Sequence, residues 1–416
     1  MKKIVFILIA SISVSTFSQE RLTLTDCYQL LEINYPLVKQ HQLLENQHQK
    51  DAEIISNSKL PQFNIDAQAT YQSDVIEFPV AMSSIEPQNK DQYRATVSVN
   101  QLIYNGGATA ANLKVKAAAL KTKKKNIETS IYQLKTQINQ LYFSILLTQE
   151  SLKLLEVKEL QLQTKLKEVK SGIKYGTLLP ASDTVLEAEL LKIKQQFIEV
   201  ESNKLSLMET LSSLIGESLN SETKFEKPLI KTQLQSAINR PELDLFQLKK
   251  EEINNYESLI SKQNSPRLNG FATGGYGNPG LNMLDNSFQT FYTVGVKLHW
   301  NVFDWNTNKK QQEVVAINKD FIENETEIFK LNTNIALDKQ QKEIEKITAF
   351  INSDLEIIAL RKKVLKTFDS QLKNGVITSS IYTTEFTNLF EAENTLLKHK
   401  IQIELAKTNY NTIKGE

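Results

Sequence analysis

Four segments of the chain alternate apolar and polar residues with a period of two, the pattern of β-strands whose two faces differ. The alternation is complete from Gln62 to Tyr71 and clear from Tyr292 to Trp300, and it is weakest in the glycine-rich third segment. We therefore expect strands at about residues 62–72, 93–104, 267–277 and 291–303.

Alternation over about ten residues with aromatic residues near the strand ends is the signature of transmembrane β-strands, and the aromatic residues would lie at the membrane interfaces. The residues that we expect to face lipid are Phe63, Ile65, Tyr71, Tyr93, Val97, Val99, Tyr276, Tyr292, Val294, Val296, Leu298 and Trp300. The alternative is a soluble antiparallel sheet with one wet face, whose apolar face the helices would cover.

The number of strands bears on assembly. Four strands cannot close a barrel, and an open sheet edge is not stable in lipid. Closure would therefore need several chains, with eight strands from two copies or twelve from three, and the strands alone do not decide between them.

Long tracts without glycine or proline follow the second and fourth strands, at about residues 108–171 and 307–373. A helix over residues 108–171 would be roughly 95 Å long. Apolar residues form only narrow stripes along these tracts, which indicates coiled-coil-like packing. Each tract ends at a break, at about residues 172–182 and 374–380, where glycine stops the helix and Ser or Thr caps the next one. We expect two helical hairpins with these breaks as their tips.

The chain contains two copies of one unit. Pro36 and Pro241 are 205 positions apart, as are Pro61 and Pro266, whereas Gly176 and Gly375 are 199 apart. A loop shorter by six residues in the second copy explains the difference. We expect repeats at residues 19–216 and 233–416, joined by a connecting, equatorial segment at 217–232.

The first 18 residues have the features of a secretory signal peptide, with Lys2 and Lys3 ahead of an apolar stretch and small residues before Gln19. No later stretch of about 18 or more apolar residues follows. Without Lys2 and Lys3 the basic residues fall from 49 to 47 against 48 acidic ones, which gives no electrostatic reason to expect nucleic-acid binding. The one cysteine, Cys27, is expected to be buried or incidental.

Several segments, taken in order and in double occurrence, resemble the TolC outer-membrane efflux family. They are the paired segments around Pro36 and Pro241, the strand starts at Pro61 and Pro266, the sequence from Gln101 to Gly107, and the two tips. The resemblance covers about residues 20–414.

The resemblance implies a mainly α-helical protein with a transmembrane β part. It implies a homotrimer whose four strands per chain form a twelve-stranded barrel surrounded by outer-membrane lipid, and whose coiled-coil helices form an α-barrel in the periplasm. It further implies docking through the tips onto a periplasmic adaptor that is linked to an inner-membrane pump. The function implied is a passive exit duct for drugs, metals or secreted polypeptides, in efflux or type I secretion, with no cofactor.

The tip and docking candidates are Gly176, Ser182, Asp183 and Gly375. The best-known family members narrow the tunnel with acidic residues a few positions after the second tip glycine. The corresponding positions here are Ile381 and Thr384, which puts an acidic gate in doubt. Glu385 is adjacent, and a hydrophobic or mixed gate would use Ile381 and Tyr382.

No pattern supports catalysis or a metal site. His41 and His48 are seven residues apart, whereas two histidines that bind one metal on a helix favour a spacing of four. The basic run from Lys114 to Lys125 could meet anionic lipid headgroups, but a solvated helix surface is the plainer interpretation. The glycines between residues 270 and 277 lack the context of a phosphate loop, and kinking or close strand approach explains them better.

Two other classes of protein are alternatives, a periplasmic adaptor and a structural coiled-coil protein of the cell envelope. An adaptor usually has one hairpin within a β-rich module, whereas two equivalent hairpins are expected here. A purely structural coiled coil does not account for the four alternating strands.

Overall fold

A computed structural model describes residues 21–76, 87–231 and 237–416. The expected signal peptide, residues 1–18, lies outside the described residues. The described chain is mainly α-helical and forms two compact units, which we call the tip unit and the strand unit. The described residues of the tip unit are 21–38, 130–231, 237–240 and 330–416, and those of the strand unit are 39–76, 87–129 and 241–329. Each unit therefore contains parts of both sequence copies.

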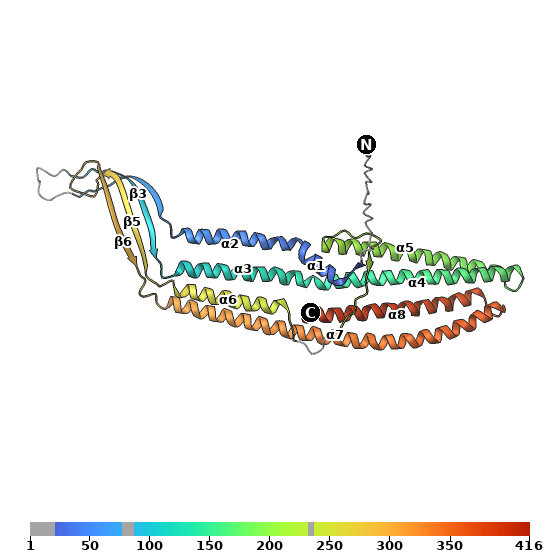
Figure 1. The fold of residues 1–416 in the computed structure, drawn as a ribbon. Coiled ribbons are helices and arrows are strands. Elements are labelled where there is room, and N and C mark those ends of the chain that lie inside the picture. The colour runs from blue at the N-terminus through green and yellow to red at the C-terminus, as the bar shows by residue number, and fades with distance from the viewer. Residues whose placement is uncertain (1–20, 77–86, 232–236) are drawn as a thin grey trace, which may run out of the picture. The chain divides into compact units, whose positions relative to one another are not determined.

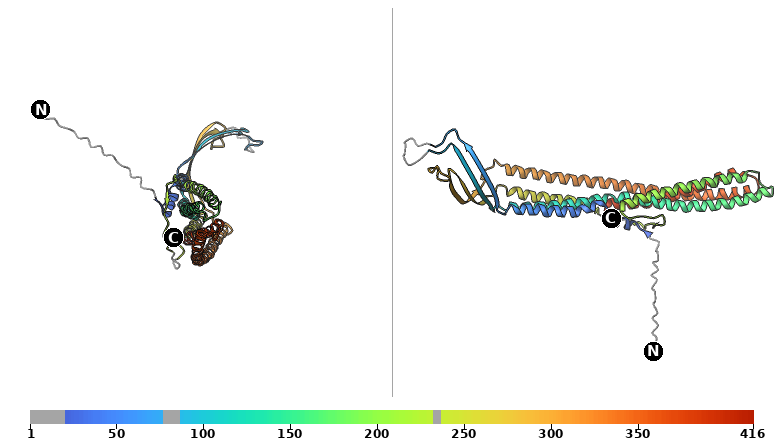
Figure 2. Two further views of the ribbon diagram at one scale, coloured as in Figure 1. Left: turned by 90° about the vertical axis from the view of Figure 1, so that its right-hand side faces the viewer. Right: turned by 90° about the horizontal axis from the view of Figure 1, so that it is seen from above.

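The strand unit holds a four-stranded antiparallel sheet in which the strands lie side by side in the order β2-β3-β5-β6 (Figure 1). The strands are β2 (Gln62–Tyr71), β3 (Asp91–Tyr104), β5 (Arg267–Asn278) and β6 (Gln289–His299). All four expected strands are present. The fourth is shorter than expected because its last pair is Arg267 with His299, so the expected residues 300–303 lie beyond the ladder. The sheet is curved (Figure 2).

The helices of the strand unit are joined by ion pairs between lysines and carboxylates. They are α2 (Lys39–Asn57), α3 (Ala108–Gln133), α6 (Pro241–Ser261) and the first part of α7 (Thr307–Lys373). From α3, Lys116 reaches Asp51 of α2 at 3.1 Å, and Lys121 reaches Glu251 of α6 at 3.0 Å. The basic run from Lys114 to Lys125 thus contributes to helix packing on both sides of α3.

The tip unit contains the two helical hairpins (Figure 1). Its elements are β1 (Arg21–Leu22), α1 (Leu24–Asn34), the 3-10 helix η1 (Pro36–Val38), α4 (Lys135–Lys174), α5 (Ser182–Ile215), β4 (Lys224–Phe225), the rest of α7, and α8 (Ser379–Lys414). The helix expected over residues 108–171 is interrupted at Leu134, which separates α3 from α4. The tract from 307 to 373 is one helix, as expected.

The core of the hairpins follows a heptad pattern. In α4, Leu155, Leu162 and Val169 are buried at intervals of seven residues and pack in one cluster with Leu186 and Ile193 of α5. A repeat of seven keeps one narrow stripe facing a neighbouring helix, so the hairpins pack as a coiled coil does.

The connecting segment is attached to the tip unit by a short parallel pairing of β1 with β4. The hydroxyl of Tyr142 lies within hydrogen-bond distance of the carbonyl oxygens of Leu22 (2.9 Å) and Glu226 (2.7 Å) beside this pairing, and its single proton can be donated to either. Cys27 is fully buried nearby, and burial raises the pKa of its thiol to about 12. Among the described residues, no helix is both long enough and apolar enough to cross a bilayer.

Candidate functional site

One face of the sheet is apolar and exposed. The register pairs Phe63 with Val99 and Ile65 with Val97, and it continues the same face through β5 to Tyr292 and Val294 of β6. Ile65 is 81% and Tyr292 80% exposed in the single chain. All the residues expected to face lipid lie on this face or in continuation of it. Trp300, just past β6, donates its indole N–H to the carbonyl of Asn264 at 3.1 Å.

The opposite face is polar but carries two phenylalanine rings that lie over glycines. A Cβ added to Gly275 would come within 2.5 Å of the Phe291 ring, and one added to Gly295 would come within 2.8 Å of the Phe271 ring. The guanidinium of Arg94 lies 5.3 Å from the centre of the Phe291 ring. Residue 275 is therefore a glycine in a place where the Phe291 ring lies too close to the backbone for a larger side chain. The sequence pattern alone did not reveal the rings, because the two phenylalanines occupy polar positions of the alternation.

The two tips end their helices with glycines in the left-handed region. Gly176 has φ +74° and Gly375 has φ +70°, a conformation that costs glycine little. Thr378 caps α8, because its hydroxyl accepts from the backbone N–H of Ile381 at 3.4 Å. The cap of α5 differs from the expected Ser or Thr cap, since Ala181 occupies it without a side-chain hydrogen bond.

The other tip candidates of the first hairpin begin α5. Ser182 is its first residue and is buried, while the carboxylate of Asp183 accepts from the backbone N–H of Thr184 at 2.9 Å. Asp183 therefore helps to satisfy the first turn of the helix, where a negative charge is favourable.

The four candidates that follow the second tip divide by burial. Ile381 and Thr384 are exposed, whereas Tyr382 and Glu385 are buried. Tyr382 belongs to the core cluster of the hairpins, and burial raises the pKa of its hydroxyl to about 12. Nη1 of Arg361 lies 3.0 and 3.1 Å from the two carboxylate oxygens of Glu385. A gate that used Tyr382 or Glu385 would first have to unpack the hairpin, so only Ile381 and Thr384 remain as surface candidates.

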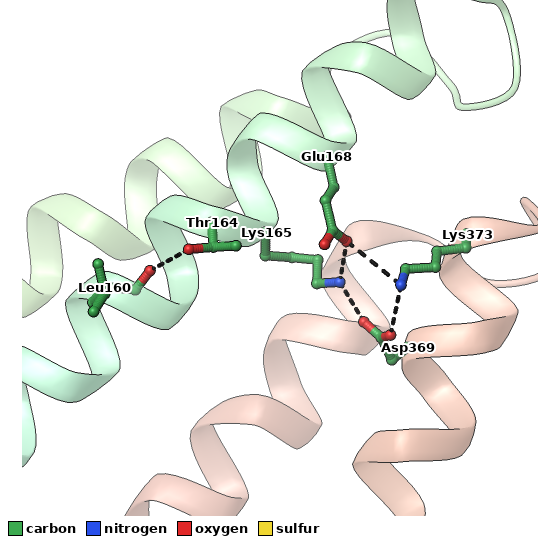
Figure 3. Close-up of polar contacts among 6 residues, drawn as sticks. All are labelled: Leu160, Thr164, Lys165, Glu168, Asp369 and Lys373. Carbon is green, nitrogen blue, oxygen red and sulfur yellow. Dashed lines mark hydrogen bonds and ion pairs between the residues drawn. The ribbon is translucent and has the colours of Figure 1, made fainter.

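An ionic network joins the two hairpins near their tips (Figure 3). Lys165 of α4 forms ion pairs with Glu168 on its own helix and with Asp369 of α7. Lys373 adds a second ion pair to Asp369 at 3.3 Å. Burial opposes the charge of Lys165, but its hydrogen bonds to Asp369 and Glu168 outweigh burial and raise its pKa. Burial also opposes the charge of Asp369, whose pKa is nevertheless lowered by Lys165 and Lys373.

A second ion pair is more deeply buried. The ammonium of Lys158 in α4 lies 3.4 Å from the carboxylate of Glu189 in α5 and 4.2 Å from the centre of the Phe390 ring. The hydroxyl of Thr387 also donates to Glu189 at 3.2 Å. Burial lowers the pKa of Lys158 even though Glu189 favours its charge.

The histidines show no arrangement for metal binding. Within residues 21–76, 87–231 and 237–416, no group of three or more His, Cys, Asp or Glu side chains could hold a metal ion. His48 lines a small pocket with Asp51 and Lys116, and the basic Lys116 disfavours a cation there.

Comparisons with known proteins point to one class. Residues 27–217 match the family model of the outer membrane efflux proteins, while no curated protein matches the sequence at a significant level. Among solved structures, the chain is similar to CusC, with a TM-score of 0.69 and 11% identity over 94% of this chain and 92% of that one.

Two further solved structures have a similar fold. VceC from Vibrio cholerae has a TM-score of 0.64 and 12% identity over 94% of this chain and 96% of that one. The MtrE channel from Neisseria gonorrhoeae has a TM-score of 0.64 and 14% identity over 94% and 89%.

The fold is thus that of the outer-membrane channels over 94% of the chain. The family match to the outer membrane efflux proteins covers residues 27–217, a little under half of the chain. The resemblance to TolC-like proteins that the sequence suggested is therefore confirmed, as is the fold class.

Proposed function

We propose that three copies of this chain form the outer-membrane exit duct of a tripartite efflux or type I secretion system. The duct is a passive conduit for drugs, metals or secreted polypeptides and performs no chemistry itself. An inner-membrane pump supplies the energy, and a periplasmic adaptor links the pump to the helical tips.

The observation that carries this proposal is the sheet. Its apolar face is exposed along all four strands, and β2 and β6 are the edges of the ladder in the described part of the chain. Lipid accepts such a face, but it does not accept open edges, whose N–H and C=O groups would lack partners. Further copies of the chain satisfy both requirements when β6 of one copy pairs with β2 of the next.

The hairpins support the part of the proposal in which an adaptor docks onto the helical tips. Each hairpin ends in a short tip fixed by a positive-φ glycine, and the two hairpins are tied together by the Lys165 network. A tip held in one conformation is a suitable surface for an adaptor, because little ordering is needed on binding. The exposed Ile381 and Thr384, together with Asp183, are the residues that we propose for docking or for the gate.

Membrane insertion can be tested with two neighbouring residues of β6. Val294 lies on the apolar face and Thr293 on the polar face, so Val294→Lys and Thr293→Lys place the same charge on opposite sides. A lysine facing lipid near the middle of the membrane costs about 2–4 kcal/mol, whereas one facing the interior costs little. We expect Val294→Lys to deplete the protein from the urea-resistant outer-membrane fraction and Thr293→Lys to leave it there.

Equal recovery of both variants in that fraction would contradict the assignment of the lipid face. Wild-type protein that leaves the membrane fraction in urea would contradict membrane insertion itself.

A further inference from the structure

The polar face of the sheet has an excess of positive charge. In the four strands this face carries Arg94, Arg267 and Lys297 as permanent cations and Asp66 as its one carboxylate. Asp91, the remaining carboxylate in these strands, pairs with Tyr71 on the apolar side at the end of the ladder. In the trimeric duct of the proposed function, this face would present nine cations against three carboxylates to the interior.

Two of the three cations lie at the helix-proximal end of the sheet. Arg267 is the first residue of β5 and pairs with His299, the last residue of β6, while Lys297 pairs with Asn269 one step further along the same face. Asp66 lies in the middle of β2, in register with Thr96. Arg267 and Lys297 thus lie where the strands join the helices, whereas Asp66 lies nearer to Arg94 on the same face.

These cations form no ion pair with the part of the chain that the structure describes. Among the described residues, no carboxylate lies within 4.0 Å of the charged groups of Arg94, Arg267 or Lys297. Asp304, in the connection from β6 to α7, forms hydrogen bonds with other groups. Its side chain accepts from the side-chain amide of Asn264 at 2.5 Å and from the backbone N–H of Asn308 at 2.9 Å.

The structure also holds Arg94 on the polar face. Its guanidinium lies over the Phe291 ring, and that ring rests on Gly275, which has no side chain to lift it. A cation over an aromatic face is stabilised by the ring without losing its charge. Arg94 is therefore placed near the loop end of the sheet, at the opposite end of the polar face from Arg267 and Lys297.

We propose that the membrane part of this duct prefers anionic solutes, and that Arg94, Arg267 and Lys297 set the preference. This inference rests on the proposed function, since it requires the polar face to line the pore. A pore lined by one sign of charge concentrates the opposite ion, and rings of Arg or Lys select for anions. The solute class favoured in this part of the duct is accordingly small carboxylates, phosphates and other anions.

The preference should weaken with salt. Exposed charges are screened over about 10 Å at 0.1 M ionic strength but over about 3 Å at 1 M. A preference that arises from strand residues on the pore wall should therefore be large in dilute electrolyte and small in concentrated electrolyte.

The test is the reversal potential of the purified full-length protein in a planar bilayer of uncharged phosphatidylcholine under a tenfold KCl gradient. We expect the wild-type reversal potential to be shifted from zero toward the equilibrium potential of chloride, which indicates a preference for anions. The triple variant Arg94→Gln, Arg267→Gln, Lys297→Gln should move it toward the potassium side, while Arg94→Lys, Arg267→Lys, Lys297→Arg should preserve the wild-type value. The reversal potential does not depend on how many channels insert, so variants that insert to different extents can be compared directly.

A matched control removes three cations elsewhere. Lys342→Gln, Lys346→Gln, Lys366→Gln changes the net charge by the same amount on the exposed surface of α7. An equal shift in this control would show that total charge, and not the strand residues, sets the selectivity, and would overturn the inference. A potassium preference in the wild type would overturn it as well. Inserted trimers that pass no ions would instead contradict the proposed duct.

Discussion

Several charged side chains of the tip unit are buried because a partner on a neighbouring helix compensates for lost solvation. Lys165 and Asp369 connect α4 with α7, Lys158 and Glu189 connect α4 with α5, and Arg361 pairs with a carboxylate of α8. A partly or fully buried charge is costly unless it is paired. Such pairs fix which helices meet and at which positions, and they make the packing of the tip unit sensitive to single substitutions.

Asp369→Asn should lower the stability of the helical part at pH 7 by about 1–2 kcal/mol, because Lys165 and Lys373 lose their shared partner. The pKa of Asp369 is lower in the folded protein than its ordinary value of 3.8. Its stabilising contribution is therefore present above pH 3.8 and is lost as the pH falls through the lower folded value. The difference from wild type should shrink in that acidic range, as measured by thermal unfolding in detergent.

The control for this prediction is Asp320→Asn on the exposed surface of α7, which should change stability by less than about 0.5 kcal/mol. If Asp369→Asn were equally neutral at pH 7, the network would contribute nothing to holding the hairpins together.

Replacing one member of the buried pair of Lys158 and Glu189 should reduce stability more than replacing both. Glu189→Gln removes the nearest counter-charge of a buried lysine and should cost about 3 kcal/mol, whereas the double variant Lys158→Met, Glu189→Leu should be much closer to wild type. The measurement is again the unfolding midpoint. A double variant less stable than Glu189→Gln alone would mean that the pair itself, and not the removal of one partner, determines stability.

At the scale of elements, the strands were the part most readily predicted from sequence, because a strand in contact with two unlike media must alternate at every residue. The expected end of the fourth strand was wrong because residues 300–303 still look apolar while the partner strand begins only at Arg267. The break at Leu134 was missed since neither glycine nor proline marks it. Burial of Tyr382 and Glu385 was also missed, because the face that a helix buries depends on its neighbours.

Two adjacent glycines of β5 should tolerate substitution differently because they point to opposite faces. A Cβ on Gly275 would come within 2.5 Å of the Phe291 ring and 2.9 Å of the carbonyl oxygen of Ala95, whereas one on Gly274 meets only a carbonyl oxygen at 3.9 Å. Gly275→Ala should therefore destabilise the sheet by about 1–3 kcal/mol. Gly274→Ala should be neutral or slightly stabilising.

The readout for this pair is the temperature at which the detergent-extracted protein loses its β-sheet circular dichroism. Similar losses in both variants would argue against the ring lying over Gly275.

At the scale of the whole molecule, the proposed duct requires other copies to close the sheet, and the sequence indicated this need without fixing the number. The described strands of one chain leave β2 and β6 as edges, and four strands are too few for closure. The number three came from resemblance to a family, not from the residues. The proposed physical basis is the pairing of β6 with β2 of the next copy, a contact between chains that a single sequence does not specify.

The central claim is that this chain works as a three-fold duct in the outer membrane, and the most direct test is the subunit count of the mature protein extracted in detergent. Native mass spectrometry, combined with particle imaging, should give three chains per particle with three-fold symmetry, a short membrane-sized barrel and a helical tunnel below it. A monomer that remains soluble without detergent would contradict the account, and the four strands would then belong to an ordinary sheet covered by helices.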